Sequence, residues 1–174
     1  APMVSWSHLE QIRRQWPGPL VIKGVMHPDD ARQAAQIGAD ALVVSNHGGR
    51  QLDVAPSPLE VLPAIRDAVG DRLELILDSG VRRGSDVVIA RCLGARACIF
   101  GRPSLYGVAA AGQAGVARVL ALIRSEIDKV LAQVGCARFE ALDTGYLWPA
   151  GYGDSTISST CEISSGPAPH SRLV

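Results

Sequence analysis

Short apolar runs alternate with helix-forming segments over residues 5–104, and this alternation restricts the possible folds more than any other feature of the chain. The runs cover residues 20–25, 41–45, 73–77 and 97–100. Runs this short and continuously apolar are typical of parallel strands buried on both faces, because helices then cover the sheet. The alternation therefore predicts an α/β fold in which a βα unit is used at least four times.

The segments between the runs carry start and stop signals for helices. Ser57 and Glu60 have the spacing of a capping box, and Gly70 follows where that helix would end. Gly38 and Gly94 stand in the same position before the second and fourth apolar runs. Glycine is favoured there because it adopts the left-handed conformation that ends a helix. These signals support helices between consecutive strands.

Another helix is predicted before the first apolar run. Ser7 and Glu10 have capping-box spacing, and an amphipathic pattern runs from there to about Trp16. In a βα architecture each helix follows a strand, so this helix belongs to a unit whose strand would precede it. Four strands and one unmatched helix fit half of a barrel that typically has about 250 residues. The predicted fold is α/β, the C-terminal half of a (β/α)8 TIM barrel with four parallel strands and covering helices.

The longest predicted helix covers residues 114–135 and ends at Gly135. Beyond Tyr146 the chain is rich in Gly, Ser, Thr and Pro and loses periodicity. The predicted organisation is one half-barrel domain over residues 1–147 and a flexible tail over 148–174. The apolar stripe of the long helix is expected to pack in the core: Val116, Val119, Leu120, Ile123, Ile127, Val130, Leu131 and Val134.

The composition favours small-molecule chemistry over nucleic-acid binding. The 17 Lys and Arg residues equal the 17 Asp and Glu residues, so no net field attracts nucleic acid or an anionic surface. The four cysteines have neither a C-x-x-C pair nor metal-ligand spacing with histidine, which predicts reduced thiols and no metal site. No apolar stretch approaches the roughly 20 residues that span a bilayer, and no charged-then-apolar leader is found. We therefore expect a cytoplasmic protein.

Residues 45–51 read Ser-Asn-His-Gly-Gly-Arg-Gln and follow the second apolar run. Histidine is the side chain best matched to proton transfer near neutral pH, and arginine can bind a carboxylate through two parallel hydrogen bonds. A lone histidine is more often structural, and Arg50 could instead form a weak loop salt bridge with Asp53. The two glycines between His47 and Arg50 free the backbone to turn sharply at the mouth of the strand. The company of Gly48, Gly49 and Arg50 favours proton transfer by His47, and the planar guanidinium group of Arg50 favours carboxylate binding.

Polar residues also follow the other predicted strands, at the end of a barrel where active sites lie. Lys23 interrupts the first run, and its ammonium group is costly to bury unless it meets an anion or extends to solvent. Residues 78–84 follow the third strand, and Gly101 and Arg102 follow the fourth. In a C-terminal half-barrel these loops would follow strands seven and eight, where phosphate sites combine basic side chains with amides at a helix start. The pattern predicts a phosphate site.

The segment 45–51 closely resembles the active-site signature of the FMN-dependent 2-hydroxy-acid dehydrogenases and oxidases, the family of glycolate oxidase, L-lactate dehydrogenase and (S)-mandelate dehydrogenase. The resemblance implies oxidation of an L-2-hydroxy acid to the 2-oxo acid, with two electrons passing to FMN. It implies that His47 takes a proton from the substrate and that Arg50 holds the substrate carboxylate. The family often has glycine where this chain has Ser79. The implied flavin-binding residues are Lys23 and Ser45 at the ring, Asp78 at the ribityl chain, and Gly80, Arg82, Gly101 and Arg102 at the phosphate.

Family members also use residues from the first four strands, which are not found in this chain. The expected partners are therefore a small 2-hydroxy carboxylate and either the missing N-terminal half-barrel or a second copy of the chain. A homo-oligomer is expected at full length, where peripheral attachment to the inner membrane is an alternative to a purely cytoplasmic location. Two other functions stay open: a non-catalytic half-barrel that self-associates through its open edges, and binding of only a phosphorylated ligand. The particular hydroxy acid, the electron acceptor and the choice between hydride and carbanion chemistry are left open by these residues.

Overall fold

The structure is a computed structural model, and it describes residues 4–148. Its centre is one parallel sheet with the strand order β1-β2-β3-β4. Neighbouring strands are also neighbours in sequence, with Val21 opposite Ala41 and Leu77 opposite Cys98. This is the arrangement of successive βα units, and it confirms the four predicted parallel strands. The strands are β1 (Val21–Lys23), β2 (Ala41–Val44), β3 (Glu74–Asp78) and β4 (Ala97–Ile99).

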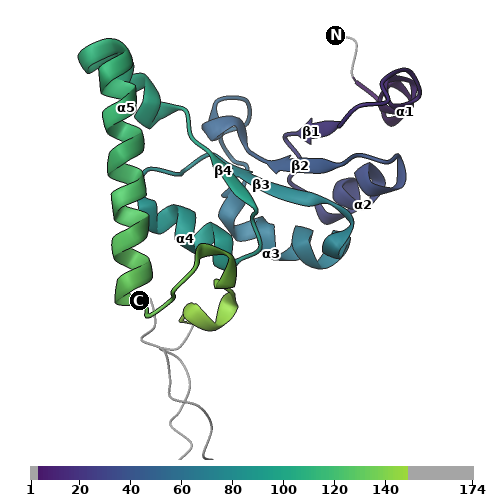
Figure 1. The fold of residues 1–174 in the computed structure, drawn as a ribbon. Coiled ribbons are helices and arrows are strands. Elements are labelled where there is room, and N and C mark those ends of the chain that lie inside the picture. The colour runs from purple at the N-terminus through teal and green to yellow at the C-terminus, as the bar shows by residue number, and fades with distance from the viewer. Residues whose placement is uncertain (1–3, 149–174) are drawn as a thin grey trace, which may run out of the picture.

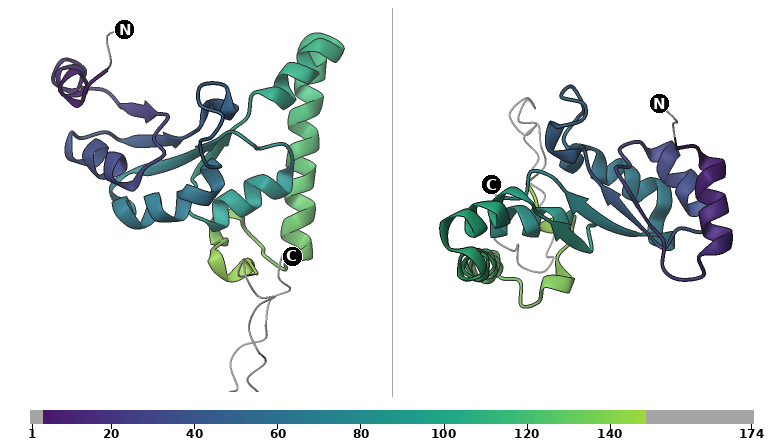
Figure 2. Two further views of the ribbon diagram at one scale, coloured as in Figure 1. Left: turned by 180° about the vertical axis from the view of Figure 1, so that it is seen from behind. Right: turned by 90° about the horizontal axis from the view of Figure 1, so that it is seen from above.

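Helices α2, α3 and α4 lie along one face of the sheet, whereas no helix of the described residues covers the opposite face (Figure 1; Figure 2). The main core fills the covered side, where Leu42 and Val44 of β2 pack with Leu62 and Ile65 of α3. The helices are α1 (Trp6–Gln15), α2 (Pro28–Gln36), α3 (Pro58–Val69), α4 (Gly84–Cys92) and α5 (Arg102–Gln133), with short 3-10 turns η1 (His47–Gly49), η2 (Gly70–Arg72), η3 (Phe139–Ala141) and η4 (Thr144–Tyr146).

Burial of the strands on both faces, as expected from their apolar runs, is found only for β2. All four of its residues are buried, whereas Val21 of β1 is 48% exposed and Ile99 of β4 is 42% exposed. These two strands are the edges of the sheet. Their neighbouring residues Ile22 and Cys98 pack on the core under the helices, so by strand alternation Val21 and Ile99 lie on the face without a helix cover. The apolar runs therefore located the strands, although among residues 4–148 helices cover only one face of the sheet.

The predicted helix signals are correct at α3 and displaced at α1. The Ser57 amide donates to Glu60 Oε2 over 2.9 Å, which confirms that capping box, and Gly70 ends the helix with φ +57°. At α1 the cap is Ser5, whose amide donates to the His8 ring over 3.2 Å. Ser7 lies two residues after this cap, so the predicted box with Glu10 began too late. A histidine ring nitrogen replaced the carboxylate that capping-box spacing normally requires.

Helix α5 is longer than the predicted helix over 114–135, because it begins at Arg102 and bends at Ala111 and Gly112. Gly107 packs directly on Gly115 across this bend, where a Cβ on Gly115 would lie 1.9 Å from the Gly107 carbonyl oxygen. By length and composition α5 could cross a membrane, contrary to the sequence expectation. The bend divides it into two pieces, and a bent helix with its halves in contact is shorter than a straight span.

The apolar stripe of α5 is core at one end only. Ile123 and Val134 are buried, and this part of the helix packs on α4. Leu120 is 52% exposed, contrary to the core prediction, because α5 extends past the end of α4 beside the sheet (Figure 1). The predicted flexible tail lies outside the described residues, apart from Trp148.

Candidate functional site

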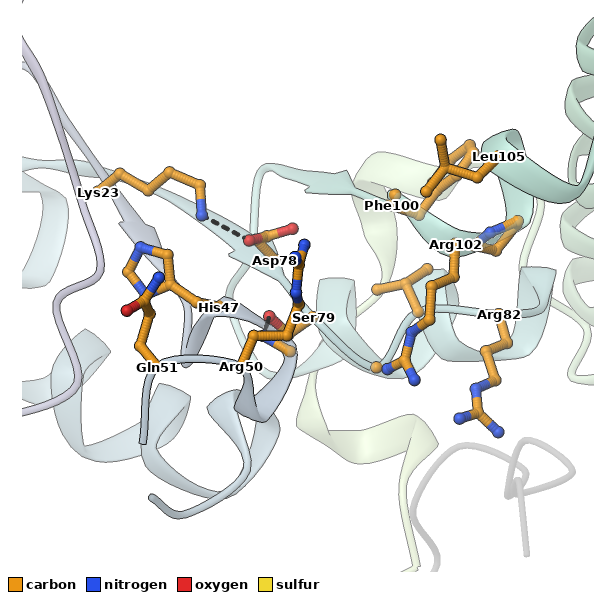
Figure 3. A pocket seen from close by; sticks show the side chains of 15 residues that line it. Lys23, His47, Arg50, Gln51, Asp78, Ser79, Arg82, Phe100, Arg102 and Leu105 are labelled. Carbon is orange, nitrogen blue, oxygen red and sulfur yellow. Dashed lines mark hydrogen bonds and ion pairs between the residues drawn. The ribbon is translucent and has the colours of Figure 1, made fainter. Parts of the chain in front are cut away.

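The carboxyl ends of the four strands surround a cavity of about 380 Å³ (Figure 3). Strand ends of a parallel sheet lie along one edge, so residues far apart in sequence meet there. Lys23 and His47 lie toward one end of the cavity and Arg82 and Arg102 toward the other, with Arg50, Asp78 and Ser79 between them. Of the residues predicted for the site, the cavity is lined by Lys23, His47, Arg50, Asp78, Gly80, Arg82, Gly101 and Arg102. Only Ser45 is absent from the lining, because it lies below the surface with 1% exposure.

Lys23, Ser45 and Asp78 form a hydrogen-bonded cluster across three neighbouring strands. Lys23 Nζ donates to Asp78 Oδ2 over 2.7 Å and to Ser45 Oγ over 3.0 Å. Ser45 Oγ donates to Asp78 Oδ2 over 2.6 Å. Lys23 is thus paired with an anion inside the site, although its side chain is also 45% exposed. Because this side chain lines the cavity, it is placed to meet a ligand as well.

The cluster also sets the charge of Asp78. Partial burial alone would raise the pKa of this carboxyl group, but hydrogen bonds from Lys23 and Ser45 and the Lys23 charge outweigh it. The net result is a pKa below its ordinary value. Asp78 is therefore a carboxylate acceptor at neutral pH, suited to hydroxyl groups of a ligand.

His47 is carried by η1, a turn with three successive residues of positive φ. His47 has φ +56°, Gly48 +69° and Gly49 +76°. The two glycines adopt this conformation freely, whereas His47 must be held in it. The His47 amide donates to Ser45 Oγ over 3.1 Å, which anchors the start of the turn to the end of β2. This confirms that the paired glycines allow a sharp turn directly after the strand.

The sequence reasoning missed Gly24, which touches the His47 ring. A Cβ on Gly24 would lie 2.9 Å from His47 Cε1, closer than side-chain carbons normally approach. Gly24 also has φ +93°, and its amide donates to the Val43 carbonyl over 3.0 Å. Its position beside Lys23 in an otherwise apolar run was the only sequence signal for this close approach.

The weak salt bridge that could have occupied Arg50 is not among the ion pairs of residues 4–148, so Asp53 does not compete for the guanidinium group. Arg50 instead lines the cavity (Figure 3). A guanidinium group in a cavity beside a histidine can bind a carboxylate with both of its edge nitrogens. The pair is therefore arranged for an acidic small molecule.

The basic end of the cavity differs in one respect from the sequence expectation. The amides of Arg82 and Arg83 donate to Asp86 Oδ2 over 2.8 and 2.9 Å, and the Gly84 amide donates to Glu126 Oε2 over 2.7 Å. The hydrogen bond from the Gly84 amide is the main reason why the pKa of Glu126 lies below its ordinary value, and the hydrogen bond from the Arg83 side chain is the second. These three amides at the start of α4 are thus occupied, and the Arg82 and Arg102 guanidinium groups carry the positive charge at this end.

The glycines at the basic end leave room for a ligand. Gly80 has φ +85°, and a Cβ on Gly80 or Gly101 would meet no atom within 4 Å. Neither glycine is therefore needed for packing inside the described structure. Open backbone next to two guanidinium groups is suited to close approach by a phosphate.

The family model described as FMN-dependent dehydrogenase matches residues 1–149. The chain belongs to this family. It is 46% identical over 146 residues to an L-lactate oxidase of Nostoc sp., covering 84% of this chain and 40% of that protein. It is 55% identical over 134 residues to an L-lactate dehydrogenase of Caulobacter vibrioides, covering 77% of this chain and 35% of that protein.

A crystal structure of the monotopic membrane protein (S)-mandelate dehydrogenase matches with a TM-score of 0.79 and 45% identity. The match covers 82% of this chain and 38% of that one. The chain therefore spans between one third and about two fifths of the length of the relatives described here. These findings confirm the predicted family, its dependence on FMN and the α/β fold, and they are consistent with part of a barrel. The roles of individual residues remain predictions.

Proposed function

We propose that this chain contributes the flavin-binding and proton-accepting part of a site that oxidises L-2-hydroxy acids of the lactate, mandelate or glycolate type to 2-oxo acids. The observation that carries the proposal is the single cavity shared by His47, Arg50 and Lys23 with the basic end at Arg82 and Arg102. A proton acceptor beside a carboxylate ligand suits a hydroxy acid. A separate basic end suits the phosphate of a cofactor.

The residues fit FMN along the length of the cavity. Asp78, held as a carboxylate, would accept hydrogen bonds from the ribityl hydroxyl groups. Arg82 and Arg102 would hold the phosphate beside the open backbone of Gly80 and Gly101. Lys23 and Ser45, which are joined by a hydrogen bond, would hold the ring. When bound, FMN accepts the two electrons that leave the substrate.

The protein's own part in the reaction is placement, charge and proton transfer. Arg50 would hold the substrate carboxylate by two parallel hydrogen bonds, which fixes the substrate's orientation beside His47. His47 would take a proton from the substrate through its imidazole, a group whose ordinary pKa suits this task. The Lys23 ammonium would provide fixed positive charge where negative charge develops.

We further propose that the site is completed by a polypeptide that supplies the first four βα units. The open sheet face and the exposed edge residues Val21 and Ile99 support this, because an uncovered apolar edge favours association. The combination of both polypeptides is called the completed barrel below. A homo-oligomer of the completed barrel in the cytoplasm is the arrangement we propose, with peripheral membrane attachment as the alternative.

The test is reconstitution with FMN and a panel of L-lactate, (S)-mandelate and glycolate. The completed barrel should bind FMN, and each accepted substrate should bleach the oxidised-flavin absorbance in the absence of oxygen. The 174-residue chain alone should show weak FMN binding and no comparable turnover. His47→Gln in the completed barrel should keep FMN and lose most turnover.

Three results would contradict the proposal. A completed barrel that binds FMN but reduces it with none of these acids would exclude the hydroxy-acid assignment. Binding of inorganic phosphate without FMN would favour the phosphorylated-ligand alternative. A stable dimer of the chain that excludes both FMN and the added half would favour the non-catalytic half-barrel.

A further inference from the structure

Ser79 follows β3 and has a backbone conformation that serine rarely adopts. Its φ is +86°, and among the described residues the only other non-glycine residue with positive φ is His47. Such conformations cost free energy and persist only where surrounding contacts hold them. Glycine would adopt this conformation without that cost. The presence of serine therefore directs attention to what its hydroxyl group does.

The Ser79 hydroxyl group contacts the turn that carries His47. The Gly48 amide donates to Ser79 Oγ over 2.9 Å, and Ser79 Oγ lies 3.4 Å from Ser45 Oγ. The same Gly48 amide lies 3.0 Å from Asn46 Oδ1, so two acceptors share it. Asn46 precedes the turn directly, whereas Ser79 comes from the end of the neighbouring strand β3. Of the two acceptors, only Ser79 joins the turn to another strand.

Consecutive amides of this turn are thus held by two serine hydroxyl groups. Ser45 Oγ accepts from His47, and Ser79 Oγ accepts from Gly48. The His47 backbone needs such support because its own conformation is strained. Gly24 lies against the ring from the side of β1. The backbone of the turn is therefore held from the ends of β2 and β3, and its ring is bordered by Gly24 after β1.

We propose that Ser79 is a positioning residue, whose hydroxyl group ties the His47 turn to the end of β3 and so fixes the imidazole relative to Lys23 and Asp78. The proposal rests on the function proposed above and deepens it. Ser79 acts on the reaction through His47. Loss of the hydroxyl group leaves the turn anchored by Ser45 and Asn46, which adjoin it in sequence, and gives the ring more freedom.

The hydrogen bond from the Gly48 amide to Ser79 Oγ can be tested on the 174-residue chain by NMR, without FMN. Ser79→Ala should raise the exchange rate of the Gly48 amide hydrogen by up to about fivefold, the factor that corresponds to complete loss of one net hydrogen bond, because Asn46 Oδ1 still accepts from this amide. Ser79→Gly should raise it similarly while relieving the backbone strain, so it should be the more stable of the two variants. Ser5→Ala is the matched control, because it removes a serine hydroxyl group at the start of α1 and should leave Gly48 exchange unchanged.

The positioning role is then measured in the completed barrel. Both Ser79 variants should lower kcat about tenfold, with less than a twofold change in the Kd for FMN, since small misplacements of a catalytic group have large effects on rate. Unchanged Gly48 exchange in both variants would show that the Ser79 hydroxyl group does not hold the turn. Full kcat, or a loss of FMN affinity in step with kcat, would overturn the positioning role. Failure of the proposed function is distinct, because the unsubstituted completed barrel would then oxidise none of the acids.

Discussion

Replacing Gly24 by alanine should displace His47 and slow catalysis in the completed barrel. The added Cβ would lie 2.9 Å from His47 Cε1, whereas ordinary van der Waals contact begins at 3.4 Å, so the ring must move by about 0.5 Å. A misplacement of about 1 Å can cost as much as a hundredfold in rate. For half that displacement we expect kcat to fall about tenfold.

The same substitution should also lower stability. Gly24 has φ +93°, a conformation that costs an L residue about 1–2 kcal/mol. The contact with the ring adds a cost of about 1 kcal/mol, the lower end for overpacking, because the ring borders an open cavity and can move. The free energy of unfolding should therefore fall by about 2–3 kcal/mol, measured by urea denaturation.

Gly38→Ala is the matched control for backbone strain. Gly38 has φ +81°, but an added Cβ would meet only Arg13 Cδ, at 3.7 Å, which is ordinary contact. This variant should lose about 1–2 kcal/mol of stability and keep its kcat. Equal loss of kcat in both variants, or full kcat in Gly24→Ala, would refute the reasoning that the Gly24 contact places His47.

Three further predictions concern charged groups of the site. Lys23→Met should raise the Kd for FMN about tenfold, since a charge-assisted hydrogen bond is lost, and an unchanged Kd in a flavin titration would remove Lys23 from the site. Arg50→Lys should lower kcat/KM for the hydroxy acid about tenfold, because an ammonium group cannot form the bidentate pair, and steady-state kinetics with equal values for both forms would exclude it as the carboxylate ligand. Because the pKa of Asp78 is lowered from 3.8 in the folded chain, its stabilising effect should be complete well above this pH and disappear as the pH falls through the folded value. Thermal unfolding should therefore show a shallower acid dependence in Asp78→Asn, and parallel curves would contradict the assignment.

Features that depend on neighbouring residues in the chain could be predicted from the sequence. The apolar runs located β2 and β3, and the Ser57 capping box located the start of α3. The spacing in residues 45–51 placed His47 and Arg50 at a strand end, which the structure confirms. These predictions succeed because hydrogen bonding within a turn of helix and burial of a short strand are local effects.

The start of α5 shows where local reasoning failed. Helical geometry is interrupted at Ala111 and Gly112, so the apolar periodicity of residues 114–135 did not indicate the first part of the helix. Contact between Gly107 and Gly115 keeps both parts together, and it depends on how the chain folds back on itself. Exposure of Leu120 likewise depends on where α4 ends relative to α5.

The sequence by itself determined the order of strands and helices and the types of side chain that reach the strand ends. Only the tertiary structure decided which of those side chains meet. Lys23 and Asp78 are far apart in the chain, yet Lys23 Nζ lies 2.7 Å from Asp78 Oδ2. The Ser79 hydroxyl group, at the end of β3, accepts a hydrogen bond from the Gly48 amide, which follows the neighbouring strand β2. The physical reason is that parallel pairing sets strand ends side by side, so each contact depends on register and on the loops between the strands. A hydrogen bond requires atoms within about 3 Å, a precision that residue patterns do not contain.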